Sequence, residues 1–412
     1  MSESCDVLVI GAGLAGLQCA RELQAAGREV QVWEASDDVG GRIRTDEVNG
    51  FLVDRGFQVL NPAYPAVRRW VDVEALRNKP FGAGIGVRLD DRLAVLANPV
   101  REPGQLAATL RSGLLRPAAL ARLARWAAPA LGRPARLKTG PDLPLREALD
   151  KVGLTGDLRT IVDRFYAGVL LEDGGDTSNE FALLLLRMFA LGAPGLPAAG
   201  MQALPRQLAQ GLTVRTDTRV QSVVPGGAEV EVYADGAAAR ARTVVVATDP
   251  TTAGALTPVK APAMKGVLTW WYAATHLPTS LDLLCVDART RSGGPLVNVA
   301  VMTAAAPSYA PPGNHLIQAS ALLHPGQEPP SEAEARKHAG EIFGSSTHGW
   351  EVVARHEITH ALPTQLPPLK LEQPLASGSR VLVCGDHRDT ASIQGALVSG
   401  HRAAQHVLAG SR

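Results

Sequence analysis

Three glycines near the start of the chain have the spacing and the surroundings of a phosphate-binding turn. Gly11, Gly13 and Gly16 follow an apolar run, and an acidic residue, Glu34, closes the next apolar run. In such a turn the first glycine permits a tight bend, the second lets a pyrophosphate approach the backbone, and the third lets a helix pack closely on a strand. The helix N-terminus carries partial positive charge, and the acid can accept hydrogen bonds from a ribose hydroxyl. These residues therefore predict a dinucleotide-binding site.

The segments between these residues have the hydrophobic patterns that such a site requires. Residues 7–10 form a continuous apolar run, which is typical of a parallel strand buried on both faces. From Leu14 onward, apolar residues recur at helical spacing until Gly27, which is expected to end the helix. Residues 30–33 form the next strand. Because strand, helix, strand and acid occur in the order that the motif needs, we prefer this interpretation to that of an isolated structural turn.

Further motifs follow at both ends of the chain. Gly40, Gly41 and Arg42 come soon after the acid, and residues 50–57 read GFLVDRGF. Near the C-terminus, residues 380–386 predict a buried strand that closes in Gly-Asp, and residues 392–400 open a last helix. Together these motifs resemble the flavin-containing amine oxidoreductase and phytoene desaturase superfamily. The resemblance implies FAD as the cofactor and an oxidoreductase as the activity.

The resemblance also implies roles for individual residues. Glu34 is expected to bind the adenosine ribose, Arg42 to lie over the pyrophosphate, and Asp386 to bind the ribityl or pyrophosphate region. The helix that begins after Ser392 is expected to point its N-terminus at the flavin ring. Val220 is expected to contact the adenine through its backbone. The full set of predicted cofactor-binding residues is Gly11, Gly13, Leu14, Ala15, Gly16, Glu34, Ala35, Gly40, Gly41, Arg42, Gly56, Phe57, Val220, Ala247, Gly385, Asp386, Ser392 and Ile393.

The predicted fold class is α/β, with a discontinuous Rossmann-type FAD-binding domain and a second α+β domain. The first domain is expected to comprise residues 1–62, 202–262 and 375–412. The second is expected to comprise residues 63–201 and 263–374 and to form the substrate cavity against the flavin. Its apolar runs predict strands at 267–273, 281–286, 296–303, 316–321 and 352–360 in a mostly antiparallel sheet. A capping box of Ser331 and Glu334 predicts a helix between the last two strands.

Composition narrows the possible partners and the compartment. The 412 residues carry a formal net charge of +1, so no global field draws the chain to nucleic acid. The four cysteines are widely scattered and form no C-x-x-C pair, which favours a reducing cytoplasm over a disulfide framework. The polar N-terminus does not resemble a signal peptide, and no apolar run is long enough to span a membrane. The expected location is cytoplasmic, with membrane association left open.

The segment 103–141 is basic and punctuated by leucines. It contains no acid, and its leucines and Trp126 recur at roughly helical spacing. A basic amphipathic helix can lie in a membrane interface, so this segment predicts a peripheral membrane contact. A helical lid over the substrate cavity is the alternative, and both hold if an apolar substrate enters through the lid. Its cations are Arg111, Arg116, Arg122, Arg125, Arg133, Arg136 and Lys138.

One further motif matches a metal site by its letters alone. Residues 356–360 read HEITH, the H-E-x-x-H pattern of zinc proteases, which requires a helix to bring both histidines to one face. The surrounding Val, Ile and Thr residues favour a strand instead. We therefore predict no metal site here.

The residues leave the reaction less certain than the cofactor. The family's amine oxidases usually carry a tyrosine where Ser392 stands and a lysine on the strand after residue 248, and Lys265 is not in clear register with it. Both departures favour a desaturase acting on an apolar, carotenoid-like substrate. An amine or protoporphyrinogen oxidase and a non-redox flavin isomerase are the alternatives. Trp270, Tyr272 and His387 are the weak catalytic candidates, and the electron acceptor and oligomeric state stay open.

Overall fold

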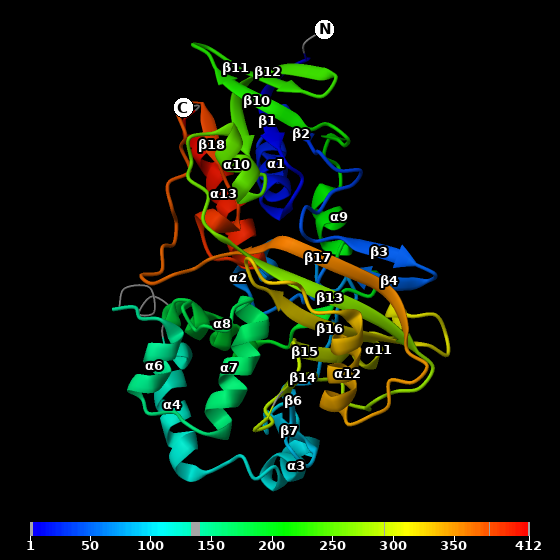
Figure 1. Cartoon of the computed structure of the whole chain (residues 1–412). Coiled ribbons are helices and arrows are strands. Elements are labelled where there is room, and N and C mark those ends of the chain that lie inside the picture. Colours follow the sequence, from blue (N-terminus) through cyan, green and yellow to red (C-terminus); the bar gives the residue numbers. More distant parts are fainter. Residues whose placement is uncertain (1–2, 133–140, 292, 379, 411–412) are drawn as a thin grey trace.

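The structure is a computed structural model that describes residues 3–132, 141–291, 293–378 and 380–410. Two seven-stranded sheets within these residues organise the chain, one above the other in Figure 1. The first and last segments of the chain meet in the upper sheet, and a group of helices lies beside the lower one (Figure 1).

The first sheet is the mixed sheet that the glycine motif requires. β1 pairs in parallel with β2 and β12, and β12 pairs in parallel with β18, so strands far apart in the sequence lie together. β10 and β11 extend the sheet in antiparallel fashion from β12. The strands are β1 (Glu3–Ile10), β2 (Val30–Trp33), β9 (Val214–Arg215), β10 (Val220–Pro225), β11 (Val230–Ala234), β12 (Ala237–Val246) and β18 (Val381–Val383).

Helices cover this sheet with their apolar sides. α1 and α13 pack on each other, and residues of both belong to one buried core with the strands. α1 carries no side-chain cap at its N-terminus, whereas the Ser392 hydroxyl accepts a hydrogen bond from the Gly395 N–H at the start of α13. The helices are α1 (Leu14–Ala25), α2 (Pro65–Trp70), α9 (Ala203–Ala209), α10 (Pro250–Leu256) and α13 (Ile393–Ala409).

The second sheet is mostly antiparallel, as expected. Its order is β17-β13-β16-β15-β14-β6-β7, and only β14 and β6 run parallel. Helix α12 (Glu332–Phe343) packs on one face and begins with the predicted capping box of Ser331 and Glu334. The strands are β6 (Gly84–Arg88), β7 (Leu93–Ala97), β13 (Met264–Ala274), β14 (Leu284–Asp287), β15 (Leu296–Val301), β16 (His315–Leu323) and β17 (Glu351–Pro363).

A helical group lies beside the second sheet and shares a core with it. α7 packs against β14 and β15, and α4 packs against α8. These helices are α3 (Leu106–Arg111), α4 (Pro117–Leu131), α6 (Leu145–Lys151), α7 (Asp157–Leu170) and α8 (Asn179–Leu191). The remaining elements are the hairpin β3 (Thr45–Val48) with β4 (Phe51–Asp54), the pair β5 (Lys79–Pro80) with β8 (Gly195–Leu196), and α11 (Met302–Ala305).

The expected fold class is confirmed. Each of the five strand segments predicted for the second sheet overlaps one of its strands, whereas β7 of that sheet and β9 of the first lie outside the predicted segments. The H-E-x-x-H match lies on strand β17, where the His356 ring contacts Asp46 and the backbone oxygen of Asp54. Within 103–132, the basic segment forms α3 and α4 and buries Trp126. Its last part, with Arg133, Arg136 and Lys138, lies outside the described residues. No helix in the described ranges is long and apolar enough to cross a bilayer.

Candidate functional site

A cavity of about 560 Å³ lies between the two sheets and is lined by residues of both. One part is lined by the glycine turns, the ends of the parallel strands and the N-termini of α1 and α13. The other part is lined by β13, β15, β16, β17, α7 and α8. A cavity between two domains with a few convergent polar groups is the usual place for a cofactor and its substrate.

The three glycines of the first turn have different structural duties. Gly11 adopts a φ of +104°, and a Cβ there would lie 2.9 Å from the backbone oxygen of Ala247. A Cβ at Gly16 would lie 2.0 Å from the Gly11 oxygen. A Cβ at Gly13 would meet nothing within 4 Å, so the space beside this backbone is open. Gly11 and Gly16 therefore close the turn, while Gly13 leaves room for a ligand.

Glu34 is buried at the end of β2 and is held by two backbone donors. Its Oε2 accepts a hydrogen bond from the Ala12 N–H at 2.6 Å, and its Oε1 accepts one from the Ser36 N–H at 2.9 Å. Each carboxylate oxygen has two lone pairs, so capacity remains for a ribose hydroxyl. This geometry fits the expected ribose contact.

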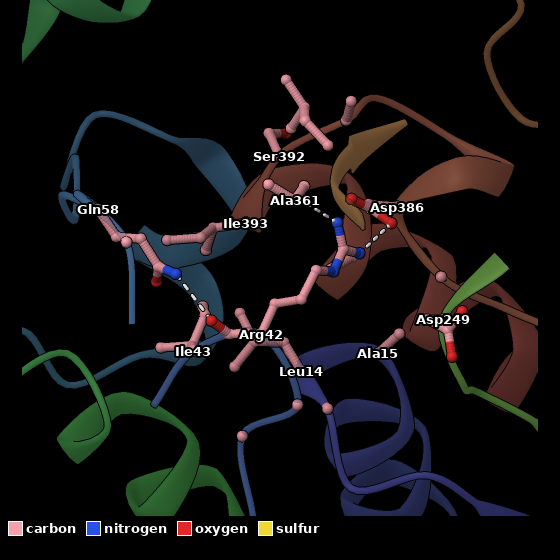
Figure 2. Close-up of a pocket in the computed structure, with 18 of the residues that line it drawn as sticks. Leu14, Ala15, Arg42, Ile43, Gln58, Asp249, Ala361, Asp386, Ser392 and Ile393 are labelled. Carbon is pink, nitrogen blue, oxygen red and sulfur yellow. Dashed lines mark hydrogen bonds and ion pairs between the residues drawn. The ribbon is translucent and has the colours of Figure 1, made fainter. Parts of the chain in front are cut away.

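Arg42 links both ends of the chain across the cavity (Figure 2). Its Nη2 lies 2.6 Å from Asp386 Oδ1, and its Nη1 donates to the backbone oxygen of Ala361 at 2.9 Å. Burial lowers the pKa of Arg42, but the Asp386 carboxylate outweighs this effect and leaves the pKa raised. The guanidinium is therefore charged and fixed beside the N-termini of two helices.

The charges and the open backbone around the cavity can be compared with the pyrophosphate and the ribose of FAD. The N-termini of α1 and α13 both reach the cavity, and the first turn of neither helix carries an acidic residue. Two positive helix ends and one fixed arginine suit an anionic pyrophosphate. The open backbone at Gly13 and the carboxylate of Glu34 provide for the phosphates and the ribose. The residues present thus fit the dinucleotide.

Of the predicted cofactor-binding residues, all but Gly16 line the cavity. Gly16 instead packs α1 against the first turn. The three catalytic candidates, Trp270, Tyr272 and His387, do not line the cavity. Trp270 and Tyr272 lie on the opposite face of β13, buried against α12 and Trp350. Trp270 and Tyr272 therefore belong to the core and not to the cavity, because the face of the sheet that carries them packs on a helix.

His387 is also turned away from the cavity. Its ring is buried beside Gly385, and neither ring nitrogen has a hydrogen-bond partner among the described residues. Burial lowers the pKa of His387 to about 4, so the ring is neutral at ordinary pH. The expectation that it serves as an acid or base at the flavin is not met by this position.

Lys265 lies on β13 beside the cavity but does not line it. Its Nζ donates to the backbone oxygen of Leu170 at 3.0 Å and contacts the Thr177 hydroxyl at 2.9 Å. Burial lowers the pKa of Lys265 to about 8. In this structure it caps the C-terminal end of α7.

Sequence reasoning missed the substrate side of the cavity. Its walls are apolar apart from Asn61, Tyr64, Asn298 and Ser320, and the charged lining residues all come from 34–55, 219–249 and 386. The apolar walls carry no motif, so only the fold brings them together. The lining residues on this side are Asn61, Tyr64, Gly168, Val169, Leu171, Phe181, Leu185, Phe189, Val267, Asn298, Ser320, Ile358, Ala361 and Leu362.

Putrescine oxidase of Kocuria rosea is 48% identical over 67 residues, which cover 16% of this chain and 14% of that protein. Protoporphyrinogen oxidase 2 of Arabidopsis thaliana is 40% identical over 73 residues, which cover 18% of this chain and 14% of that protein. The aligned stretches thus span about a seventh of these relatives' length.

Solved structures match over nearly the whole chain. A putrescine oxidase bound to putrescine has a TM-score of 0.72 at 18% identity, covering 99% of this chain and 100% of that chain. Cyclohexylamine oxidase from Brevibacterium oxydans has a TM-score of 0.70 at 15% identity, covering 98% of both chains. At this identity the likeness establishes the fold alone.

The family described as flavin containing amine oxidoreductase matches residues 14–408. This match covers every strand of both sheets except β1, and it confirms the oxidoreductase class and the FAD cofactor expected from the sequence motifs. The chain therefore belongs to the flavin-containing amine oxidoreductase family.

Proposed function

We propose that the protein is an FAD-dependent dehydrogenase or desaturase of a neutral, apolar substrate of isoprenoid or carotenoid type. The observation that carries this proposal is that the lining residues which α7, α8 and β13 contribute are all uncharged. Phe181, Leu185 and Phe189 of α8 form one apolar wall, and Val267 and Ile358 form part of another. Such walls favour a substrate that gains by leaving water.

The chain's own residues hold the cofactor and position the substrate. Gly13, Glu34 and Arg42 would hold the phosphates and the ribose, and the N-terminus of α13 would face the flavin ring. When bound, FAD supplies the two-electron acceptor for a hydride lost from the substrate. The apolar walls orient the reacting C–H bond and exclude water from it.

An amine oxidase is the second candidate, and the family neighbours favour it. Putrescine oxidase and cyclohexylamine oxidase share this fold. No lining residue on the substrate side carries a carboxylate that could pair with an ammonium group. An amine would therefore have to bind as its neutral base, which costs affinity at neutral pH.

Anaerobic bleaching of the bound flavin tests the proposal. The FAD-loaded protein is mixed with carotenoids, porphyrinogens and amines, and the flavin absorbance is followed. We expect polyenes or other neutral apolar compounds to bleach the flavin. If amines alone bleach it, the second candidate is correct and the desaturase proposal is wrong.

A further inference from the structure

We infer that Asn298 is a specificity residue that binds a neutral hydrogen-bond acceptor on the substrate, such as a carbonyl oxygen. This inference rests on the proposed function, because it concerns the substrate that the apolar cavity takes. It adds that the substrate is not a plain hydrocarbon. Asn298 is 3% exposed and lines the cavity on the substrate side.

A short polar ladder crosses the sheet at this point. The Gln318 Nε2 donates to Asn298 Oδ1 at 2.6 Å, and the Ser320 and Thr269 hydroxyls lie 3.0 Å apart. All four side chains are buried, and the strands that carry them are β15, β16 and β13. The ladder uses the Asn298 carbonyl and the Ser320 hydroxyl. It leaves the Asn298 amide nitrogen available.

The Asn298 Nδ2 has no acceptor among the described residues, although its side chain is almost wholly buried. Because Asn298 lines the cavity, an acceptor for this nitrogen would come from a molecule bound in the cavity. The Ser320 hydroxyl already pairs with Thr269, and the Asn61 Nδ2 donates to the Met188 oxygen. Tyr64 precedes α2 and belongs to the wall beside α13. Among these lining side chains, Asn298 is therefore the one in the wall away from α13 whose donor has no acceptor in the described residues.

Two local features of the fold aim this carboxamide. The pairing of β15 with β16 shifts register between Leu296 and Asn298, and such bulges redirect side chains near functional sites. On the facing helix α7, a Cβ at Gly168 would lie 2.3 Å from Asn298 Nδ2. Glycine inside a helix is less favourable than alanine. Gly168 thus lowers the stability of α7 but leaves room for the Asn298 carboxamide.

Three probes of similar shape test the inference on the FAD-loaded protein. Acetophenone offers a carbonyl oxygen, ethylbenzene offers no acceptor, and 1-phenylethylamine is a cation at neutral pH. Equilibrium dialysis in sealed cells gives a dissociation constant for each. The dissociation constant for ethylbenzene is divided by that for acetophenone, and this ratio is compared between variants. The free energy of transferring each probe out of water is the same for every variant, so it cancels in the comparison.

Asn298→Leu keeps the size of the side chain and removes its donor. We expect the ratio to fall about three- to tenfold, the value of one hydrogen bond. Gly168→Ala should lower it in the same direction, because the new methyl group displaces the carboxamide. Thr269→Val is the matched control, since it removes a hydroxyl from the ladder without touching the cavity, and it should leave the ratio unchanged.

The outcomes separate this inference from the proposed function. An unchanged ratio in Asn298→Leu, with thermal stability and FAD content retained, overturns the inference and leaves the proposed function standing. An equal fall of the ratio in Asn298→Leu and Thr269→Val would show that Asn298 has only a structural role, and this outcome would also overturn the inference. If the wild-type protein binds neither neutral probe but binds the amine, the proposed function itself fails.

Discussion

Tyr309 and Asp54 are joined by a buried hydrogen bond between segments 255 residues apart. The Tyr309 hydroxyl donates to Asp54 Oδ2 at 3.0 Å, while Asp54 Oδ1 accepts from the Thr45 hydroxyl at 2.6 Å and from the Met201 N–H at 3.0 Å. One carboxyl group thus ties together the hairpin, the loop before α9 and the turn after α11. Burial raises the pKa of Asp54 to about 6 despite these donors.

The raised pKa of Asp54 predicts a pH dependence of stability. The folded state binds the Asp54 proton more tightly than the unfolded state, whose pKa is near 3.8. The resulting stabilisation is complete below about pH 4 and is lost as the pH rises through about 6. Its size is about 3 kcal/mol. Asp54→Asn should remove this component, so urea denaturation at pH 4 and pH 7 should show a smaller difference for the variant than for the wild type. An equal change in the free energy of unfolding between pH 4 and pH 7 in the variant and the wild type would contradict this prediction.

Two glycine substitutions in one turn should affect different properties of the protein. Gly16→Ala should destabilise the protein without cofactor by about 1–3 kcal/mol, because its methyl group meets the Gly11 oxygen. Gly13→Val should leave that stability nearly unchanged and weaken FAD binding at least tenfold, because its side chain fills the open space. Thermal unfolding without FAD and flavin retention on gel filtration measure the two effects. A Gly13→Val protein that retains FAD would show that the phosphates lie elsewhere.

Removal of Arg42 should release the cofactor. Arg42→Met leaves Asp386 buried without its ion-pair partner and removes the cation beside the helix ends. We expect at least a tenfold rise in the dissociation constant for FAD, measured by flavin fluorescence. Arg42→Lys is the matched control, and it should recover part of the affinity because it restores the charge without the two-pronged donor geometry. Full FAD affinity in Arg42→Met would rule out the pyrophosphate contact.

The proposed peripheral membrane contact remains to be measured. Leu110 on α3 and Leu131 on α4 are 63% and 73% exposed, and arginines surround them in the sequence. If these helices bind an anionic bilayer, Leu110→Asp with Leu131→Asp should abolish cosedimentation with phosphatidylserine vesicles. Leu277→Asp changes an exposed leucine of the loop after β13 and serves as the control. Absence of wild-type cosedimentation would refute the contact.

The cofactor half of the site could be predicted from the sequence because its determinants are local. The tight turn at Gly11, the close packing at Gly16 and the acid at the end of β2 occur within one strand, helix and strand unit. Their spacing reports the backbone geometry directly. The capping box of Ser331 and Glu334 is also a local signal, and it is formed.

The substrate half of the site could not be predicted, because it depends on which face of the second sheet is covered. The alternation of side chains along a strand does not show which face that is. The sequence shows that Trp270 and Tyr272 share a face. Only the packing of α12 decides that this face is core, so that Val267 on the other face meets the cavity. Likewise, Asn298 lies on a strand that reads as uniformly buried, and Gly168 lies on a helix far from it in the sequence. Their approach is a long-range contact, which the tertiary structure alone determines.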